Sequence, residues 1–164
     1  MQVYRIAQKQ FINDLSGEGA RLFGGHWNHR GTPLLYTAES RSLATLELLV
    51  HAQKLSALSN LSILTLEIPD KIKIDDILKI TKLPQNWQKY TSHPELQDTV
   101  SIWIESDGFI LKVPSAIIKE ESNYLINPRH KNMNMLKVVK TEDFILDERL
   151  LSNSSFQRKP DIER

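Results

Sequence analysis

The residues of this chain that are best suited to chemistry begin with a glycine pair beside an aromatic residue, in Gly24-Gly25-His26-Trp27-Asn28. Glycines let the backbone approach a ligand closely. Further along, Tyr36 stands at the end of an expected strand and Glu47 lies within an apolar helical segment. A carboxylate among leucines costs free energy unless a partner or a ligand requires it there. The combination therefore indicates a ligand pocket rather than plain core.

Glu47 is open to two interpretations. A glutamate on the helix surface would pair with His51, one turn further on, or with Lys54, and contribute roughly a few tenths of a kcal/mol. A carboxylate in a mostly apolar pocket would instead stabilise a positive charge that develops on a ligand. The spacing alone does not choose between them.

Tyr36 and Ser115 also have ordinary interpretations. A tyrosine at a strand end commonly packs within the sheet, although its ring can also stack on a flat ligand. Ser115 follows a strand that Pro114 is expected to end, and its ordinary role would be to cap a helix beginning at Ala116. One chain does not establish a Ser-His-Asp geometry, so Ser115 is not assigned as a nucleophile.

Several familiar site motifs are missing. Gly17-x-Gly19 is followed by Leu22 where the dinucleotide fingerprint needs glycine, and the chain has neither a Walker lysine motif nor a Gly-x-Ser-x-Gly elbow. His26 and His29 are not spaced as helical metal ligands, and no cysteine completes a set. We therefore expect no metal site and interpret both as loop histidines.

Composition points to an ordinary globular protein. The 164 residues are 40% hydrophobic and 25% charged, which suits one domain over residues 1–150 with a polar tail over 151–164. The net charge of +1 gives no field that favours nucleic acid or an anionic membrane. The chain has no cysteine, no apolar run long enough for a membrane span and no signal-like N-terminus, so we expect a cytoplasmic location.

Hydrophobic periodicity predicts strands and helices without regular alternation, hence an α+β fold with a strongly bent or split sheet. Strands are expected at residues 3–6, 34–37, 61–68, 109–113, 124–126, 136–139 and 144–146. Helices are expected at residues 11–15, 40–55, 75–80 and 96–104, and residues 17–33 are expected to form a loop because they hold five of the six glycines. Ser40 should cap the second helix, whose apolar residues on most sides predict packing on more than one side.

The ordered set of these motifs resembles the RES-domain toxins of bacterial toxin–antitoxin pairs, whose antitoxin is an Xre-type DNA-binding protein. No single piece is specific, but their order and spacing extend over roughly residues 1–150. The matching pieces are Tyr4-Arg5, residues 16–21, 24–28, 31–33, 36–40 and 44–47, Val113-Pro114-Ser115-Ala116, and residues 123–128.

The resemblance implies an ADP-ribosyltransferase-like fold, with split or bent β-sheets and flanking helices, that binds NAD in a cleft. It implies a toxin that depletes NAD by cleaving the nicotinamide–ribose bond, through hydrolysis or phosphorolysis, with NAD as substrate and no metal. The alternative is an ADP-ribosyltransferase that modifies a cellular protein. The implied partner is a cognate Xre-family antitoxin in a hetero-oligomer, and any DNA contact should belong to that partner.

The resemblance also assigns roles to residues. Glu47 would stabilise the oxocarbenium-like ribose while it hydrogen-bonds a ribose hydroxyl, and Ser115 would orient Glu47 or the ribose. Tyr36 would stack on or wall the nicotinamide. Arg5 and His26 would hold the pyrophosphate or the adjacent ribose.

One position departs from the family pattern. The family loop reads Gly-Gly-Arg-Trp-Asn, whereas His26 follows Gly25 here, at the point where the loop is expected to contact the dinucleotide. Histidine lacks the forked donor geometry and permanent charge of arginine. Three interpretations stay open: a natural variant that works with histidine, a weakened or inactive toxin, or a charge supplied instead by Arg21 or Arg5.

Overall fold

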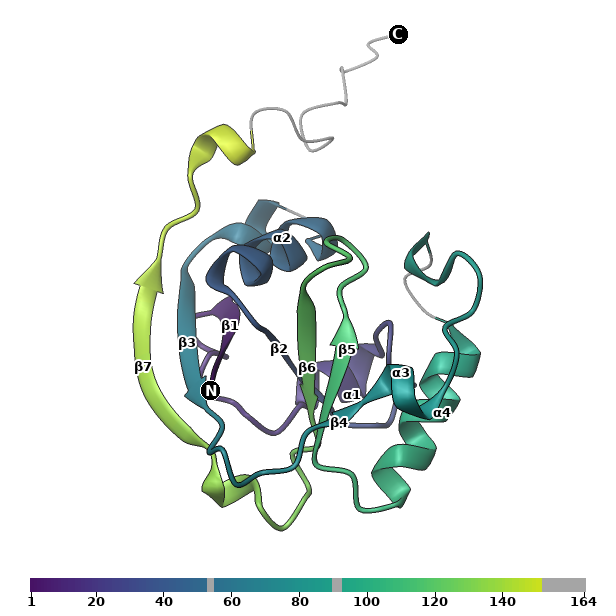
Figure 1. Ribbon diagram of the computed structural model, residues 1–164. Coiled ribbons are helices and arrows are strands. Elements are labelled where there is room, and N and C mark those ends of the chain that lie inside the picture. The colour runs from purple at the N-terminus through teal and green to yellow at the C-terminus, as the bar shows by residue number, and fades with distance from the viewer. Residues whose placement is uncertain (53–54, 90–92, 152–164) are drawn as a thin grey trace, which may run out of the picture.

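The computed structural model describes residues 1–52, 55–89 and 93–151, so most of the predicted polar tail lies outside the described residues (Figure 1). The strands are β1 (Gln2–Gln8), β2 (Leu35–Ala38), β3 (Leu61–Glu67), β4 (Asp75–Asp76), β5 (Ile110–Pro114), β6 (Ser122–Ile126) and β7 (Lys137–Phe144). The α-helices are α1 (Glu18–Phe23), α2 (Arg41–His51), α3 (Ile77–Ile80) and α4 (Pro94–Glu105). Short 3₁₀ turns cover Leu55–Leu58, Trp87–Lys89, Met133–Met135 and Glu148–Leu150.

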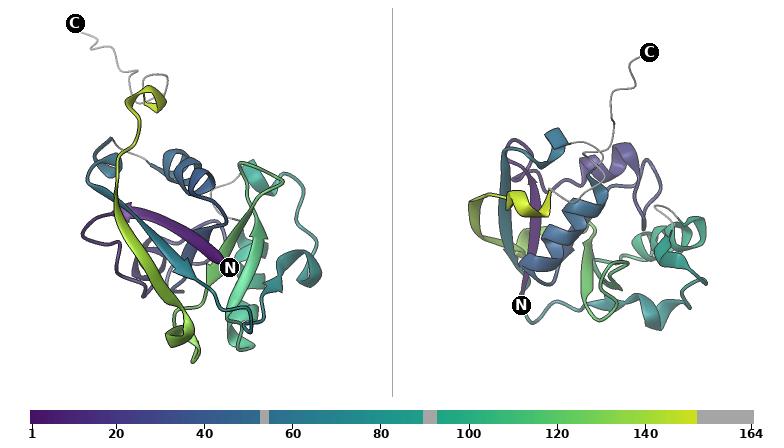
Figure 2. Two further views of the ribbon diagram at one scale, coloured as in Figure 1. Left: turned by 60° about the vertical axis from the view of Figure 1, so that its left-hand side comes forward. Right: turned by 90° about the horizontal axis from the view of Figure 1, so that it is seen from above.

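All seven strands form one sheet in the order β4-β5-β6-β2-β1-β3-β7, antiparallel except between β4 and β5. The run of paired residues is shortest between β1 and β2, because these strands pair at a single position, where Tyr4 lies opposite Ala38. The strands on either side of this junction diverge, and α2 lies between the two parts (Figure 2). The predicted α+β class is confirmed, with a sheet that is bent and continuous.

Apolar side chains cover both faces of the β5–β6 part of the sheet. Successive strand residues point to opposite faces, so Ile110 and Ile126 enter one buried cluster with Leu64 and Leu66 of β3. Leu111 and Leu125 enter the other cluster, which α4 closes. Its buried members are Trp27, Leu34, Ile77, Trp87, Leu96, Val100, Trp103, Leu111, Val113 and Leu125. The two buried clusters therefore pack against opposite faces of β5 and β6 and fix the position of both strands.

Helix α2 begins as predicted, because the Ser40 hydroxyl accepts the backbone N–H of Leu43 at 3.0 Å. The prediction that α2 is packed on more than one side is wrong. Only Leu43 and Ala44 are buried, against Ala38 and neighbouring residues, whereas Val50 is 62% exposed. The helix ends at His51, short of the expected residue 55. Of its other apolar residues, Leu48 and Val50 border a cavity instead of a second layer of protein.

The predicted helix at residues 11–15 is also wrong. Arg5 Nη1 donates to the carbonyl oxygens of Phe11 and Ile12, at 3.1 and 2.7 Å, and the chain turns there. The predicted loop at residues 17–33 contains α1, which follows Gly17 in a left-handed conformation, and the Ser16 hydroxyl accepts the N–H of Glu18 at 3.2 Å. The sequence did not predict this helix because the many glycines of this segment favoured a loop.

Three further predictions need correction. Residues 75–80 were expected to be one helix, but β4 pairs with β5 before α3 begins. No helix starts at Ala116, although the Ser115 hydroxyl accepts two backbone N–H groups as a cap would. The strands expected at 136–139 and 144–146 are one strand, β7, with a register shift where Thr65 and Leu66 face it. None of the described helices is both long and apolar enough to cross a membrane.

Gly108, in the turn between α4 and β5, supplies a test of the core. A Cβ there would overlap the indole of Trp103, which is fixed by donating Nε1–H to Asp75 at 3.0 Å. We expect Gly108→Ala to lower the free energy of unfolding by about 1–3 kcal/mol, the usual cost of overpacking. Urea denaturation measures this change.

The matched control is Gly19→Ala in α1, where a Cβ meets nothing within 4 Å. Alanine favours a helix more than glycine does, so this variant should be neutral or slightly stabilised. Equal losses of stability in both variants would contradict the packing argument.

Candidate functional site

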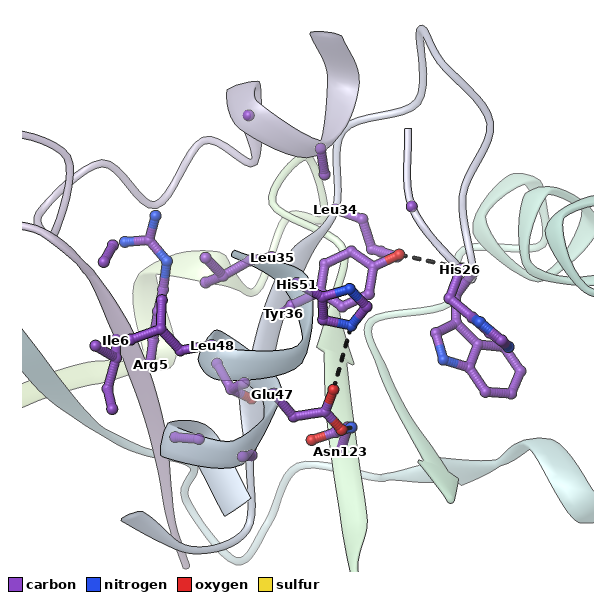
Figure 3. A pocket seen from close by; sticks show the side chains of 18 of the residues that line it. Arg5, Ile6, His26, Leu34, Leu35, Tyr36, Glu47, Leu48, His51 and Asn123 are labelled. Atoms are coloured by element: carbon purple, nitrogen blue, oxygen red, sulfur yellow. Dashed lines mark hydrogen bonds and ion pairs between the residues drawn. The ribbon is translucent and has the colours of Figure 1, made fainter. Parts of the chain in front are cut away.

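A cavity of about 600 Å³ lies between α2, the first two strands and the glycine loop. Its volume is in the range of small-molecule pockets. Arg5 comes from β1, Tyr36 from β2, Glu47 and His51 from α2, and Asn123 from β6. Figure 3 shows Glu47, His51 and Tyr36 near the centre, with Arg5 on one side and His26 on the other. The bend of the sheet thus brings the predicted residues Arg5, His26, Tyr36 and Glu47 to one cavity, together with Gly25.

The carboxylate of Glu47 is held by three neighbours. Oε1 accepts hydrogen bonds from Ser115 Oγ at 3.0 Å and Asn123 Nδ2 at 2.6 Å, and Oε2 lies 3.4 Å from His51 Nε2. Burial raises the pKa of Glu47, but the hydrogen bonds from His51, Asn123 and Ser115 outweigh it, so the pKa lies below its usual range. Glu47 is therefore a fixed anion at neutral pH that both pairs with His51 and lines the pocket.

Ser115 acts from behind the pocket wall, because it is fully buried. Its oxygen accepts the backbone N–H groups of Ile117 and Ile118, at 3.0 and 3.1 Å. With both N–H groups aimed at the oxygen, the hydroxyl proton is left to point at Glu47. Ser115 thus positions the carboxylate rather than contacting a ligand.

The phenol of Tyr36 ties the glycine loop to the sheet. Its hydroxyl donates to Asn28 Oδ1 at 2.7 Å and accepts the N–H of Trp27 at 3.2 Å. Burial raises the pKa of Tyr36 and keeps the phenol protonated. The amide of Asn28 in turn donates to the carbonyls of Ala20, His29 and Thr32. The ring of Tyr36 is thereby fixed as a wall of the cavity.

Gly25 is required by this arrangement. A Cβ on Gly25 would lie 2.6 Å from the Tyr36 hydroxyl oxygen and 2.9 Å from Asn28 Oδ1. Gln97, buried in α4, donates to the carbonyl oxygens of Gly25 and Asn28 at 2.7 and 3.1 Å. The loop that carries His26 is therefore held from the sheet and from α4.

His26 and Arg5 occupy different surroundings. The buried His26 ring lies against Trp27 and Trp87, with centroids 5.2 and 5.4 Å away. The guanidinium of Arg5 is turned to the carbonyls of Phe11 and Ile12, and burial lowers its pKa although the charge of Asp14 opposes this. The pocket therefore has an arginine at one end and an aromatic wall with a histidine at the other.

Two other predicted groups, Arg21 and His29, do not line the cavity, and each is paired with a carboxylate. Arg21 donates to both carboxylate oxygens of Glu18, at 2.7 and 2.6 Å. His29 Nε2 lies 2.7 Å from Asp98 Oδ1, so the two loop histidines diverge. Over the described part of the chain, no three His, Cys, Asp or Glu side chains gather as a metal site would require.

Sequence reasoning missed the roles of three residues. Asn123 was noticed only as part of a motif, and its side chain makes the shortest contact to Glu47. Gln97 is a polar residue among the buried positions of α4, a signal that could have identified it. His51 was considered only as a surface partner of Glu47, whereas it also lines the cavity.

Comparison with known proteins identifies the family of this chain. The model of the RES domain matches residues 2–147. A protein named Toxin Res from Yersinia enterocolitica is 37% identical over 153 residues, covering 92% of this chain and 99% of the relative. A protein named Prs ADP-ribosylating toxin from Sphingobium sp. is 34% identical over 141 residues, covering 85% and 88%.

A solved structure extends the likeness to the fold. The Mycobacterium tuberculosis MbcT–MbcA toxin–antitoxin complex contains a chain that superposes with a TM-score of 0.73 at 21% identity, covering 87% of this chain and 83% of that one. The match of the domain model over nearly the whole chain decides the family. This chain belongs to the RES domain family.

Proposed function

We propose that this chain is the toxin of a toxin–antitoxin system and consumes NAD by cleaving the nicotinamide–ribose bond. The observation that carries the proposal is the ionised Glu47, fixed by Ser115 and Asn123 inside a cavity of about 600 Å³. Relatives named Toxin Res support the assignment as a toxin.

Bond cleavage builds positive charge on the ribose carbon as nicotinamide leaves. An anion that is already in place stabilises this charge more in the transition state than in the substrate, which lowers the barrier. Glu47 supplies the anion and would accept a hydrogen bond from a ribose hydroxyl. Because nicotinamide leaves as a neutral molecule, this step needs no general acid.

The two ends of the pocket suit different parts of the dinucleotide. Tyr36 would form a wall beside the nicotinamide, near Glu47. Arg5 and His26 lie on opposite sides of Tyr36 (Figure 3), so each would contact a different phosphate or ribose. Gly25 would let the loop backbone approach the substrate at the His26 end.

Two further proposals concern the acceptor and the partner. Transfer of ADP-ribose to a cellular protein is the second candidate reaction, supported by the relative named Prs ADP-ribosylating toxin. An Xre-family antitoxin in a hetero-oligomer is the proposed partner, since the structural neighbour is a toxin–antitoxin complex. Exposed apolar residues on α1 and α2, Phe23 and Val50, offer contacts for such a protein. We place the reaction in the cytoplasm, where NAD is plentiful.

The reaction is tested with purified protein and NAD. We expect wild type to release nicotinamide and Glu47→Gln to be at least about a hundredfold slower, because a neutral amide does not offset the charge on the ribose. The control Glu105→Gln changes an exposed glutamate at the end of α4 and should keep the wild-type rate. Equal NAD loss by wild type and Glu47→Gln would refute the role of Glu47.

The departure at position 26 gives a second expectation. An arginine would place a permanent, forked charge beside the substrate phosphates. We expect His26→Arg to raise the rate of nicotinamide release, measured at subsaturating NAD. An unchanged rate would show that histidine suffices or that Arg5 supplies the charge.

The pKa of Glu47 also predicts a pH dependence of stability. Because its folded-state pKa lies below the unfolded value, its ionisation adds stability above the ordinary glutamate pKa of about 4.3. This stability is lost as pH falls through the lowered pKa. The difference in free energy of unfolding between wild type and Glu47→Gln should therefore shrink between about pH 7 and pH 3. A constant difference in urea titrations would contradict the assignment.

A further inference from the structure

The two oxygens of the Glu47 carboxylate have different surroundings. Oε1 receives both of the buried donors, Ser115 Oγ and Asn123 Nδ2. Oε2 faces only His51 among the groups that hold the carboxylate, at the longer distance of 3.4 Å. Oε1 is therefore the anchored oxygen, and Oε2 is the one placed beside a group that can exchange protons.

His51 stands between this carboxylate and solvent. It ends α2, one helical turn after Glu47, and both side chains line the cavity. The His51 side chain is 56% exposed and that of Glu47 only 20%. Water that enters from this side therefore meets the imidazole before it meets the carboxylate.

The contact with Glu47 also defines the proton positions on His51. A neutral imidazole has one N–H and one lone-pair nitrogen. Nε2 is the nitrogen turned to the carboxylate, so the neutral form of His51 that suits this contact has its N–H on Nε2 and its lone pair on Nδ1. A carboxylate that orients an imidazole, whose other nitrogen takes a proton, is the arrangement of known general-base pairs.

We propose that His51 is the general base for the acceptor, and that the acceptor it serves is water. This rests on the proposed NAD cleavage. The C1′–N bond of the nicotinamide riboside breaks, and its electron pair leaves with nicotinamide. A water oxygen forms the new bond to C1′, and its proton goes to Nδ1 of His51. The products are nicotinamide and ADP-ribose, and the proton on His51 returns to solvent at the exposed mouth.

A purely positioning role for His51 makes a different prediction. If His51 only held Glu47 in place, every acceptor would depend on it equally, because all of them use the same cationic ribose. A general base matters only for acceptors that must lose a proton. Azide is an anionic nucleophile that forms its bond to carbon without losing one, so it separates the two roles.

The experiment incubates the full chain with NAD, with and without sodium azide, and quantifies ADP-ribose and its azide adduct by mass spectrometry. His51→Gln keeps an amide donor near Oε2 but has no basic nitrogen. We expect its ADP-ribose formation to fall at least tenfold, a modest share of the about 10²–10⁴-fold effect of general bases. Its azide adduct should form within about twofold of the wild-type rate. The control His29→Gln alters a histidine paired with Asp98 outside the cavity and should keep both rates.

Three results would overturn the inference. Unchanged ADP-ribose formation in His51→Gln would show that water needs no base there. An equal fall in both products would show that His51 only positions Glu47. Absence of nicotinamide release by wild type would reject the proposed function, and His51 as its base with it.

Discussion

The structure of the site depends on fixing one carboxylate inside an apolar cavity. Burial alone raises the pKa of Glu47 and so favours the protonated form, which has no charge to offer. The hydrogen bonds from His51, Asn123 and Ser115 reverse this, and the donors of Asn123 and Ser115 converge on one oxygen. Ser115 can do so only because the N–H groups of the following turn occupy its lone pairs. Ser115 therefore accepts backbone N–H groups as a helix cap would, although no helix follows it.

The bend of the sheet creates the space around this anion. If β1 and β2 paired along their length, the hydrogen bonds would hold the two parts of the sheet side by side. Their single register position, Tyr4 opposite Ala38, instead lets the two parts diverge. The buried residues of the helix are then Leu43 and Ala44 only, and Leu48 and Val50 border the cavity. The same strands bring Arg5 to one side of that space and Tyr36 near its centre (Figure 3).

The sequence was sufficient to predict the class of fold and the gathering of Arg5, His26, Tyr36 and Glu47 at one cavity. Strand alternation and the cap at Ser40 were local signals, and they held. The errors arose where contacts with residues distant in the sequence determine the local backbone conformation. The carbonyls of Phe11 and Ile12 bond Arg5 of β1 instead of forming a helix, and β4 exists because β5 lies beside it. Such contacts have no signature within a short window of sequence.

The exchange of arginine for histidine at position 26 can be understood from its neighbours. The ring lies at the indoles of Trp27 and Trp87, surfaces that accept a neutral aromatic ring and also attract a guanidinium through their π faces. The loop is held by Tyr36 and Gln97 through the hydroxyl and backbone atoms, none of which belongs to the side chain at position 26. The residue there can therefore change its charge while the shape of the pocket is preserved. Under the proposed function, position 26 would adjust how strongly the pocket attracts phosphate, independently of the carboxylate that would act on the ribose.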